Sequence, residues 1–474
     1  MSSAKTQPAR GMRDFLPADV RKREYVIGVI KEVYERYGFE PLETPAVENI
    51  ETLMGKYGDE GNQLIFKILK RGEHAKTGEA DLALRYDLTV PLARVVAQYQ
   101  NELPKFFKRY QIQPVWRADR PARGRFREFY QCDVDVLGSK SMVVEAELIA
   151  AASDALVALG FENFVVKLNH RRILTGILEH FSIPRIQHAE ALIVLDKLNK
   201  IGADAAREEL LIKGILEKAA TGLLDFAFWE KELHDSRELD PQWQSGQGPA
   251  LYNEAALHKI ATDWLKESDG IEGVNELAEI LGLAKGLGVE NRISVQFNLA
   301  RGLSYYTGSI FEISVPDLAG SLGGGGRYDN LVGMFLDKDV PACGFSLGLE
   351  RIIVVMTERN KFPAELVTSP ADVMVTIWNE DSIGESLALA SELRSGGVRV
   401  DVYPEADKMG KQFKYASARN IPFVAIVGDD ESARGEVAIK DLRSGEQRSV
   451  KREDVAKALS PPSGRGIKGE GLAP

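Results

Sequence analysis

The chain has 474 residues, of which 44% are hydrophobic and 27% charged, with a net charge of −10. This length allows two to four domains, and the acidic balance argues against coating of nucleic acid over the whole surface. The sequence lacks both the apolar run of about 18 residues that a membrane-spanning helix needs and the apolar core of a secretory signal. Its two cysteines, Cys132 and Cys343, fit core positions of a reduced, cytoplasmic protein, and its six histidines show no zinc-binding spacing, so we expect no metal site.

The N-terminal part combines a short polar lead with a helix and a proline-interrupted strand. Residues 1–9 are expected to be disordered. Apolar residues at helical spacing over 20–37 predict an amphipathic helix that ends at Gly38. The following segment GFEPLETPAVEN predicts a strand, which Pro41 and Pro45 restrict to a sheet edge or an interface. It is therefore either an ordinary edge strand or a contact between subunits.

Two short strands and a helix come next. Residues 64–70 and 82–86 predict paired strands around a polar loop. The segment LRYDLTVPLARVVAQY then predicts a helix with Pro91 near its first turn. Asp87 or Thr89 can cap this helix, because a side-chain oxygen at a helix start accepts backbone N–H groups. A carboxylate in that place is more often a cap than a ligand, unless a second polar group converges on it.

The stretch 105–138 predicts an antiparallel hairpin, with strands at 110–117 and 126–137 joined by the loop ADRPARGR. Residues 105–127 include eight basic residues and one acidic residue, which locally reverses the sign of the overall charge. Guanidinium groups bind phosphate in a bidentate manner, so this loop suits a ligand with several phosphates.

The strands of the hairpin carry polar residues where a plain sheet would carry apolar ones. These are Arg117, Gln131 and Asp135. A solvated surface hairpin is the alternative interpretation, and the three residues favour a binding site over it.

After the hairpin the sequence turns helical. Residues 141–159 predict a helix ending at Gly160, and FVVKLNH predicts a strand. From 173 to 289, leucine, alanine, glutamate and lysine dominate and glycine is scarcer than in the flanking segments. We interpret residues 173–289 as a mainly helical insertion, long enough to hold a small core of its own.

Strand-forming sequence returns in 290–362. Residues 293–299 predict a strand, and Arg301, Tyr305 and Tyr306 follow among glycines that let a ligand approach the backbone. The run SLGGGGRYDNLV is followed by no GK[ST], so it is not a Walker loop, and by itself it is compatible with a flexible turn. CGFSLGLERI predicts a strand that turns into a helix, where Arg351 needs an anion.

The C-terminal part is a separate pattern. Residues 371–458 alternate strand and helix in the order βαβαβ and then add two short strands, which predicts a small, mostly parallel α/β domain. Lys408, Lys411 and Lys414 put positive charge along one helix and the approach to it, which suits a phosphate backbone, although a merely solvated helix face is the alternative. Residues 459–474 are of low complexity, and we expect a flexible tail.

Three segments resemble the signature motifs of one enzyme class. The GFEPLETP strand, the WRADRPARGRFREF hairpin and the CGFSLGLERI strand–helix stand in the order of motifs 1, 2 and 3 of class II aminoacyl-tRNA synthetases. RYDLT, YQCDVD and RGLSYYTG are similar to the histidyl-tRNA synthetase family, and the resemblance covers nearly all of residues 10–455. It implies an α+β fold, with an antiparallel-sheet catalytic domain at 10–172 and 290–362, the insertion at 173–289, and an anticodon-binding domain at 371–458.

The resemblance also implies an activity. Family members join L-histidine to ATP with release of pyrophosphate and pass the histidyl group to the 3′ end of tRNA(His). The implied cofactor is ATP with Mg²⁺, and the implied assembly is a cytoplasmic homodimer through residues 38–47 with no membrane partner. The alternative is the synthetase-like regulatory subunit of ATP phosphoribosyltransferase in histidine biosynthesis, which usually lacks the C-terminal domain and loses motif 2 or motif 3 arginines.

Individual roles follow from the same resemblance. Arg117 and Arg301 would be catalytic, because fixed cations stabilise charge that builds on the α-phosphate in the transition state. ATP binding is implied for Arg117, Arg125, Phe129 and Arg351. Histidine binding is implied for Asp87, Leu88, Thr89, Arg117, Gln131, Asp135, Arg301, Tyr305 and Tyr306, with Asp135 and Tyr305 on the imidazole and Asp87, Thr89 and Gln131 on the α-ammonium group. Contacts with tRNA are expected from Arg120, Arg123, Lys408, Lys411 and Lys414.

Overall fold

The structure is a computed structural model that describes residues 6–238, 248–266, 268–300, 305–363, 366 and 369–459. It divides into two units, one ending at Phe362 and the other beginning at Pro363. The expectations for residues 1–5, for Arg301 and for the tail from 460 onward lie outside the described residues. Within the described ranges, no helix is long and apolar enough to cross a membrane.

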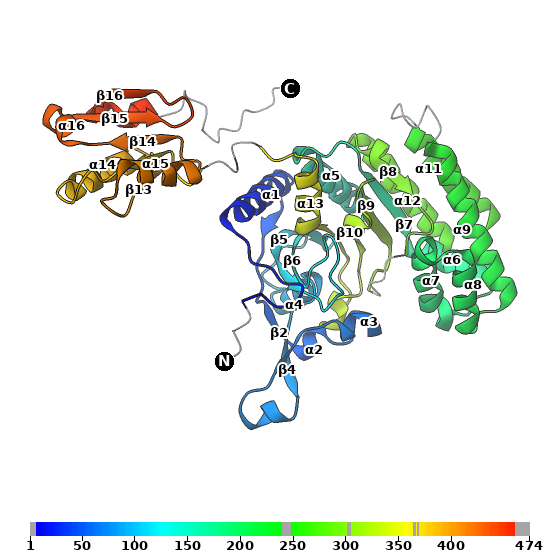
Figure 1. Ribbon diagram of the computed structural model, residues 1–474. Helices are drawn as coiled ribbons and strands as arrows, with labels where there is room; N and C mark the ends of the chain where they lie inside the picture. Colours follow the sequence, from blue (N-terminus) through cyan, green and yellow to red (C-terminus); the bar gives the residue numbers. More distant parts are fainter. Residues whose placement is uncertain are drawn as a thin grey trace. The chain divides into compact units, whose positions relative to one another are not determined.

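The first unit is built on an eight-stranded sheet with the order β1-β5-β6-β11-β10-β9-β7-β8 (Figure 1). The six inner strands pair antiparallel, and β1 and β8 each add a parallel strand at an edge. The expected antiparallel sheet is therefore extended by one strand on each side. The strands are β1 (Glu40–Pro41), β5 (Phe107–Trp116), β6 (Glu128–Leu137), β7 (Val165–His170), β8 (Ile293–Val295), β9 (Ser309–Ser314), β10 (Ser321–Arg327) and β11 (Ala342–Gly348).

The predicted hairpin lies inside this sheet as β5 and β6, which pair from Phe107 opposite Leu137 to Trp116 opposite Glu128. Successive side chains of a strand point to opposite faces, so alternate residues of the two strands share one face. This register sets three polar pairs side by side on that face: Arg109 opposite Asp135, Gln111 opposite Asp133, and Gln113 opposite Gln131.

The glycine run is a strand, so its interpretation as a flexible turn is wrong. β10 lies between β9 and β11, and a Cβ atom added at Gly325 would stand 1.9 Å from the carbonyl oxygen of Gly344. At Gly323 it would stand 2.5 Å from the carbonyl oxygen of Ser346. Side chains at these positions would clash with β11, so only glycine allows this strand to pair so closely.

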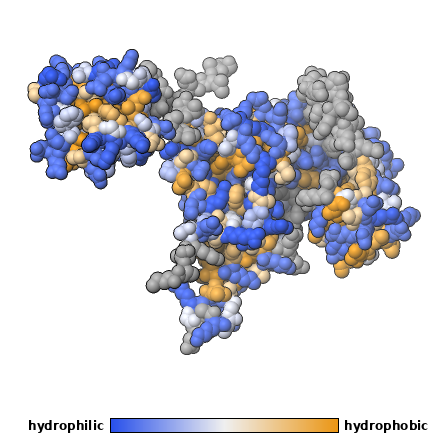
Figure 2. All heavy atoms as spheres, in the orientation of Figure 1, coloured by the Kyte–Doolittle hydropathy of each residue, from blue (hydrophilic) through white to orange (hydrophobic). Residues whose placement is uncertain are grey.

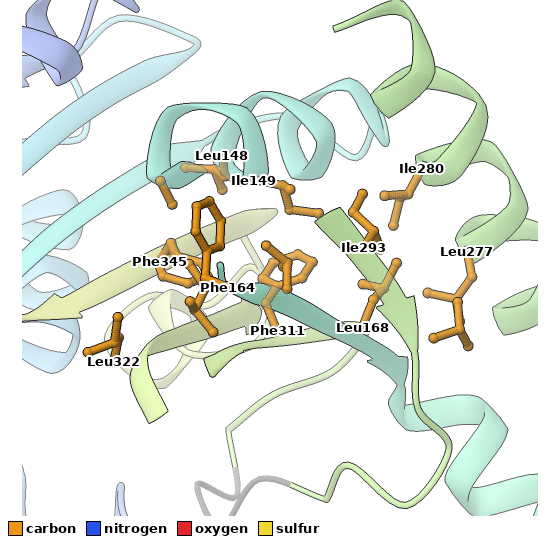
Figure 3. Close-up of a cluster of buried hydrophobic side chains, with 14 of the residues drawn as sticks. Leu148, Ile149, Phe164, Leu168, Leu277, Ile280, Ile293, Phe311, Leu322 and Phe345 are labelled. Atoms are coloured by element: carbon orange, nitrogen blue, oxygen red, sulfur yellow. The ribbon is translucent and has the colours of Figure 1, made fainter. Parts of the chain in front are cut away.

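Helices cover one face of the sheet. α1 (Pro17–Arg36), α5 (Val143–Ala158) and α13 (Leu349–Glu358) pack on one another and on β6 and β11. Their apolar residues join the sheet in one core. Figure 3 shows part of it: Leu148 and Ile149 from α5, Phe164, Leu168 from β7, Ile293 from β8, Phe311 from β9, Leu322 from β10, Phe345 from β11, and Leu277 and Ile280 from α12 (Gly270–Gly286).

The helical insertion shares this core and has no separate one among the described residues. Buried side chains run without a break from the sheet into its helices, and α12 packs against both α5 and β7. On its outer side hydrophobic residues reach the surface (Figure 2), and the most exposed large ones there are Ile186, Ile212 and Leu216. The helices are α6 (Arg171–His180), α7 (His188–Ile201), α8 (Ala203–Ile212), α9 (Glu217–Glu238), α11 (Gly248–Asp263) and α12.

A second, three-stranded sheet flanks the first unit, in the order β2-β4-β3. It contains the two predicted paired strands and also the second half of the proline-interrupted segment, so that segment is split between two sheets. The elements here are β2 (Val47–Asn49), α2 (Ile50–Leu53), α3 (Gly58–Gln63), β3 (Lys67–Leu69), β4 (Ala80–Leu84) and α4 (Thr89–Gln98).

The second unit is the α/β fold that the sequence predicts. Its five strands have the order β13-β12-β14-β15-β16, and the first three are parallel. The elements are β12 (Val373–Val375), α14 (Ile383–Ser395), β13 (Val400–Val402), α15 (Met409–Ala418), β14 (Phe423–Ile426), α16 (Asp429–Arg434), β15 (Glu436–Asp441), β16 (Gln447–Lys451) and α17 (Val455–Leu459).

Candidate active site

A cavity lies over the middle of the large sheet, between β6, β10 and β11 and the loop that joins β5 to β6. Most of the residues expected to bind ATP and histidine line it, although they come from segments far apart in the chain. Those at the cavity wall are Asp87, Thr89, Arg117, Arg125, Phe129, Gln131, Asp135, Tyr305, Tyr306 and Arg351.

The other expected residues fall elsewhere. Leu88 is fully buried beside the cavity, and its carbonyl oxygen accepts a hydrogen bond from Arg109 Nη2 at 3.4 Å. Arg120 and Arg123 belong to the β5–β6 loop outside the cavity wall, and Arg123 Nε donates to Glu358 at 3.1 Å. Arg301 is outside the described residues, so its place relative to Arg117 and Arg351 stays a prediction.

Arg117 is held so that its charge remains available to a ligand. Its Nε donates to the carbonyl oxygen of Tyr86 at 2.9 Å and its Nη2 to Gln131 Oε1 at 3.4 Å. The guanidinium carbon lies 4.3 Å from the ring centroid of Tyr86 and 5.2 Å from that of Phe129. These are neutral partners, and no carboxylate of the described chain forms an ion pair with Arg117. A half-buried cation without a charged partner favours an anionic ligand.

Arg351 enters the cavity from the first turn of α13. The preceding residue, Glu350, fixes this turn in place. Glu350 accepts from Arg23 Nη1 at 2.8 Å and from the backbone N–H of Tyr130 at 3.0 Å. The start of α13 is thus tied to both α1 and β6. Arg351 Nη1 donates to the carbonyl oxygen of Ser321, which aims the guanidinium along the edge of the glycine strand.

Asp135 marks another part of the cavity. Arg109 Nη2 lies 2.8 Å from its Oδ2 as an ion pair without hydrogen-bond geometry, and the hydroxyl of Tyr328 donates to its Oδ1. Oδ2 accepts no hydrogen bond from the described residues. Burial raises the pKa of Asp135, and Arg109 opposes that rise. The Asp135 carboxylate thus lies at the cavity wall with its charge compensated by Arg109.

Asp87 is both a helix cap and part of the cavity wall. Its Oδ1 accepts from the backbone N–H of Val90 and from the hydroxyl of Tyr57, each at 3.0 Å, and the Tyr305 hydroxyl lies 3.5 Å from its Oδ2. Burial raises the pKa of Asp87, while the Val90 N–H and the charge of Arg117 lower it. A carboxylate at a helix start counts as a candidate ligand only where a second polar group lies near it. Tyr57 and Tyr305 are such groups.

Sequence reasoning missed several polar residues of the site. Asp133, Tyr328 and Ser346 line the cavity, and Arg109 and Tyr57 hold its carboxylates from behind. A signal existed for two of them, because Arg109 and Asp133 continue the polar alternation of the hairpin strands. No local signal identifies Tyr57 or Tyr328, whose contacts depend on tertiary structure.

Two features define the catalytic domain of a class II aminoacyl-tRNA synthetase. One is the antiparallel sheet with parallel edge strands. The other is the cavity that Arg117 of the hairpin loop and Arg351 of the strand–helix segment both line. The family model described as histidyl-tRNA synthetase matches residues 11–352, and that of the anticodon binding domain matches residues 372–460. The chain belongs to the histidyl-tRNA synthetase family, whose members use ATP.

Known relatives agree over nearly the full length. The histidine–tRNA ligase of Cytophaga hutchinsonii is 41% identical, covering 95% of this chain and 98% of the relative. The structure of the histidyl-tRNA synthetase from Nostoc sp. PCC 7120 is 32% identical with a TM-score of 0.75, covering 96% of this chain and 99% of that one. A structure from Bacillus halodurans, named an ATP phosphoribosyltransferase regulatory subunit/histidyl-tRNA synthetase, is 20% identical with a TM-score of 0.66. The match covers 88% of this chain and 97% of that one. At this identity the likeness shows the fold alone.

Proposed function

We propose that this chain activates L-histidine with ATP and transfers the histidyl group to the 3′ end of tRNA(His) for protein synthesis. One observation carries the proposal within the family. A single cavity is lined by two arginines suited to phosphates, Arg117 and Arg351, and by a buried carboxylate, Asp135. Such a cavity can hold the two reactants of histidine activation against each other.

In the first step, a carboxylate oxygen of histidine attacks the α-phosphorus of ATP, the bond to the β-phosphate oxygen breaks, and pyrophosphate leaves. Charge builds on the phosphoryl oxygens in the transition state, so fixed cations accelerate the step. We assign this role to Arg117 and to Arg301. Arg351 would bind the γ-phosphate, Arg125 would bind phosphate at the loop, and Phe129 would stack on the adenine.

Histidine recognition needs polar groups that match both its ring and its amino group. The Asp135 carboxylate would accept from a ring N–H, with the hydroxyl of Tyr305 completing the contacts to the imidazole. Asp87, Thr89 and Gln131 would accept from the α-ammonium group. Tyr306 would line the pocket, and Leu88 would act from behind through its carbonyl oxygen on Arg109.

Magnesium would come to the cavity with ATP. The described residues contain no group of three or more His, Cys, Asp or Glu side chains arranged to hold a metal ion. A Mg²⁺ bound mainly by phosphate oxygens fits that composition, because this ion often keeps substrate phosphates and water as ligands. Asp119 and Glu350 are the cavity carboxylates that could add a ligand beside Arg351.

Transfer requires tRNA to reach both units of the chain. We assign phosphate contacts to Arg120 and Arg123 near the cavity and to Lys408, Lys411 and Lys414 in the second unit. Lys411 is held by Asp407 at 2.8 Å and Arg123 by Glu358, so tRNA would have to compete with these exposed ion pairs. Such exposed pairs are weak, because water and salt screen them.

The assembly we propose is a cytoplasmic homodimer. β1 is an exposed edge strand, and a groove beside it is lined by residues 42–49 together with residues of α4 and the turn after it. Val47 and Tyr99 expose 37% and 41% of their surface at this groove, and a partner's edge strand could cover them. Sedimentation equilibrium would show twice the chain mass, and a monomer at micromolar concentration would contradict the dimer.

A charging assay tests the proposed function. The chain should attach labelled histidine to the 3′ end of tRNA(His) in the presence of ATP and Mg²⁺, and should charge no tRNA with other amino acids. The regulatory-subunit alternative predicts no charging, together with stimulation of an ATP phosphoribosyltransferase catalytic subunit by the chain. That outcome would overturn the assignment.

A further inference from the structure

Asp133 is the middle one of three polar residues that β6 turns toward the cavity. Gln131 and Asp135 stand on either side of it at alternate strand positions, about 6.6 Å away at the usual rise of a strand. The Asp133 side chain lines the cavity, and the residue is 2% exposed. None of the roles assigned above involves Asp133.

The two neighbouring carboxylates differ in their counter-charges. Asp135 has the ion pair with Arg109 at 2.8 Å. Asp133 forms no ion pair within the described chain, and its hydrogen-bond partners are Gln131 Nε2 at 3.4 Å and the hydroxyl of Ser346. Arg109, which is paired with Asp135, also acts electrostatically on Asp133, and one guanidinium cannot neutralise two buried carboxylates, so Asp133 is suited to meet a further positive charge.

Asp87 alone cannot satisfy an ammonium group. Its Oδ1 already accepts from Tyr57 and Val90, and its Oδ2 faces the hydroxyl of Tyr305. An α-ammonium group has three N–H donors and a full charge. An imidazole ring, in contrast, has at most two N–H donors, and Asp135 and Tyr305 can serve them.

We infer that Asp133 is a further substrate-binding residue, which accepts a hydrogen bond from the α-ammonium group of the amino acid as a second carboxylate beside Asp87. This inference rests on the proposed function. It places the ammonium group between Gln131 and Asp135 along β6, so that the imidazole lies toward Asp135 and the carboxylate toward Arg117. The amino group is then part of what the enzyme selects.

Two small ligands distinguish the contribution of the amino group to binding from that of the imidazole ring. Histamine carries an imidazole and an ammonium group, and 4-(2-hydroxyethyl)imidazole replaces the ammonium by a hydroxyl. At pH 8 the ring is neutral and the amine charged. Isothermal titration calorimetry on the full chain would measure the affinity of both ligands for the wild type, for Asp133→Asn and for the matched control Asp135→Asn.

Asp133→Asn should weaken histamine roughly 10- to 100-fold, the worth of a hydrogen bond to a charged group, and leave the hydroxyl analogue within twofold. Asp135→Asn should weaken both ligands. Equal weakening of both ligands by Asp133→Asn, or no effect on either, would overturn the inference. Asp133→Ser serves as a second variant if the first does not fold, with ATP binding as the check on folding.

The binding assay needs neither ATP nor tRNA. A wild-type chain that binds histamine in this way but charges no tRNA would refute the proposed function and leave the role of Asp133 standing. A wild-type chain that charges tRNA(His) but binds neither ligand would overturn the inference and leave the proposed function standing.

Discussion

Arg109 and Asp135 face each other across β5 and β6 beneath the cavity, with Arg109 Nη2 2.8 Å from Asp135 Oδ2, and both side chains are almost fully buried. The pair couples the stability of the sheet to the chemistry of the site. Removing one partner leaves a buried charge without compensation, whereas removing both does not.

Arg109→Met should therefore destabilise the chain by about 3–5 kcal/mol near neutral pH. The loss should shrink at acidic pH, because Asp135 is then protonated. The double variant Arg109→Met/Asp135→Asn should recover most of the stability. Urea unfolding of the wild type and the two variants measures this, and a double variant no more stable than Arg109→Met would contradict the coupling.

Asp135→Ala should abolish recognition of histidine while ATP still binds, because we assign Asp135 to the imidazole and the phosphate-binding arginines are elsewhere. We expect histidine affinity to fall roughly 10- to 100-fold or more, since a hydrogen bond to a charged group is lost. Equilibrium dialysis with each ligand separately provides the measurement. Unchanged histidine affinity would exclude Asp135 from the imidazole pocket.

Without bound substrate, the stability of the chain should depend on pH through the titration of Asp133. Burial raises its pKa from the ordinary 3.8 to about 7, with Arg109 lowering it and Asp135 raising it. Between these values the unfolded chain loses the proton while the folded chain keeps it, so this residue's contribution to stability is full below pH 4 and is lost as the pH rises through 7. Asp133→Asn should remove this contribution. Its stability relative to the wild type should rise from pH 5 to pH 8 by up to a few kcal/mol in thermal unfolding.

Gly325→Ala tests the glycine strand. The added Cβ would stand 1.9 Å from the carbonyl oxygen of Gly344, so β10 and β11 must separate and we expect a loss of about 3 kcal/mol or more. The matched control is Gly282→Ala on the exposed face of α12, where no atom lies within 4 Å of the added Cβ. This variant should gain about 0.5–1 kcal/mol of stability. Equal stability of the two variants would show that the strand does not pair as closely as described.

The sequence predicted what depends on local pattern. The strands of the hairpin, the helical character of the insertion and the α/β order of the second unit all follow from alternation, helical spacing and turn residues. The sequence does not identify the glycine run as a strand, because glycine carries no strand pattern. Its strand becomes evident only from β9 and β11, which leave no room for side chains there.

The candidate site was predictable to a different degree. Most of the ATP- and histidine-binding residues that the motif resemblance implied line one cavity. The supports of the site could not be found in this way. Tyr57 reaches Asp87 from a separate segment, and Tyr328 reaches Asp135 over 193 residues of sequence. Such contacts depend on strand register and packing, which local sequence does not fix.

The central claim is that one cavity brings histidine and the α-phosphate of ATP together under Arg117. ATP–pyrophosphate exchange measures this step directly, without tRNA. The wild type should exchange pyrophosphate only when histidine is present, and Arg117→Ala should slow exchange by roughly 10²- to 10³-fold. Exchange without histidine, or an Arg117→Ala variant as fast as the wild type, would contradict the account.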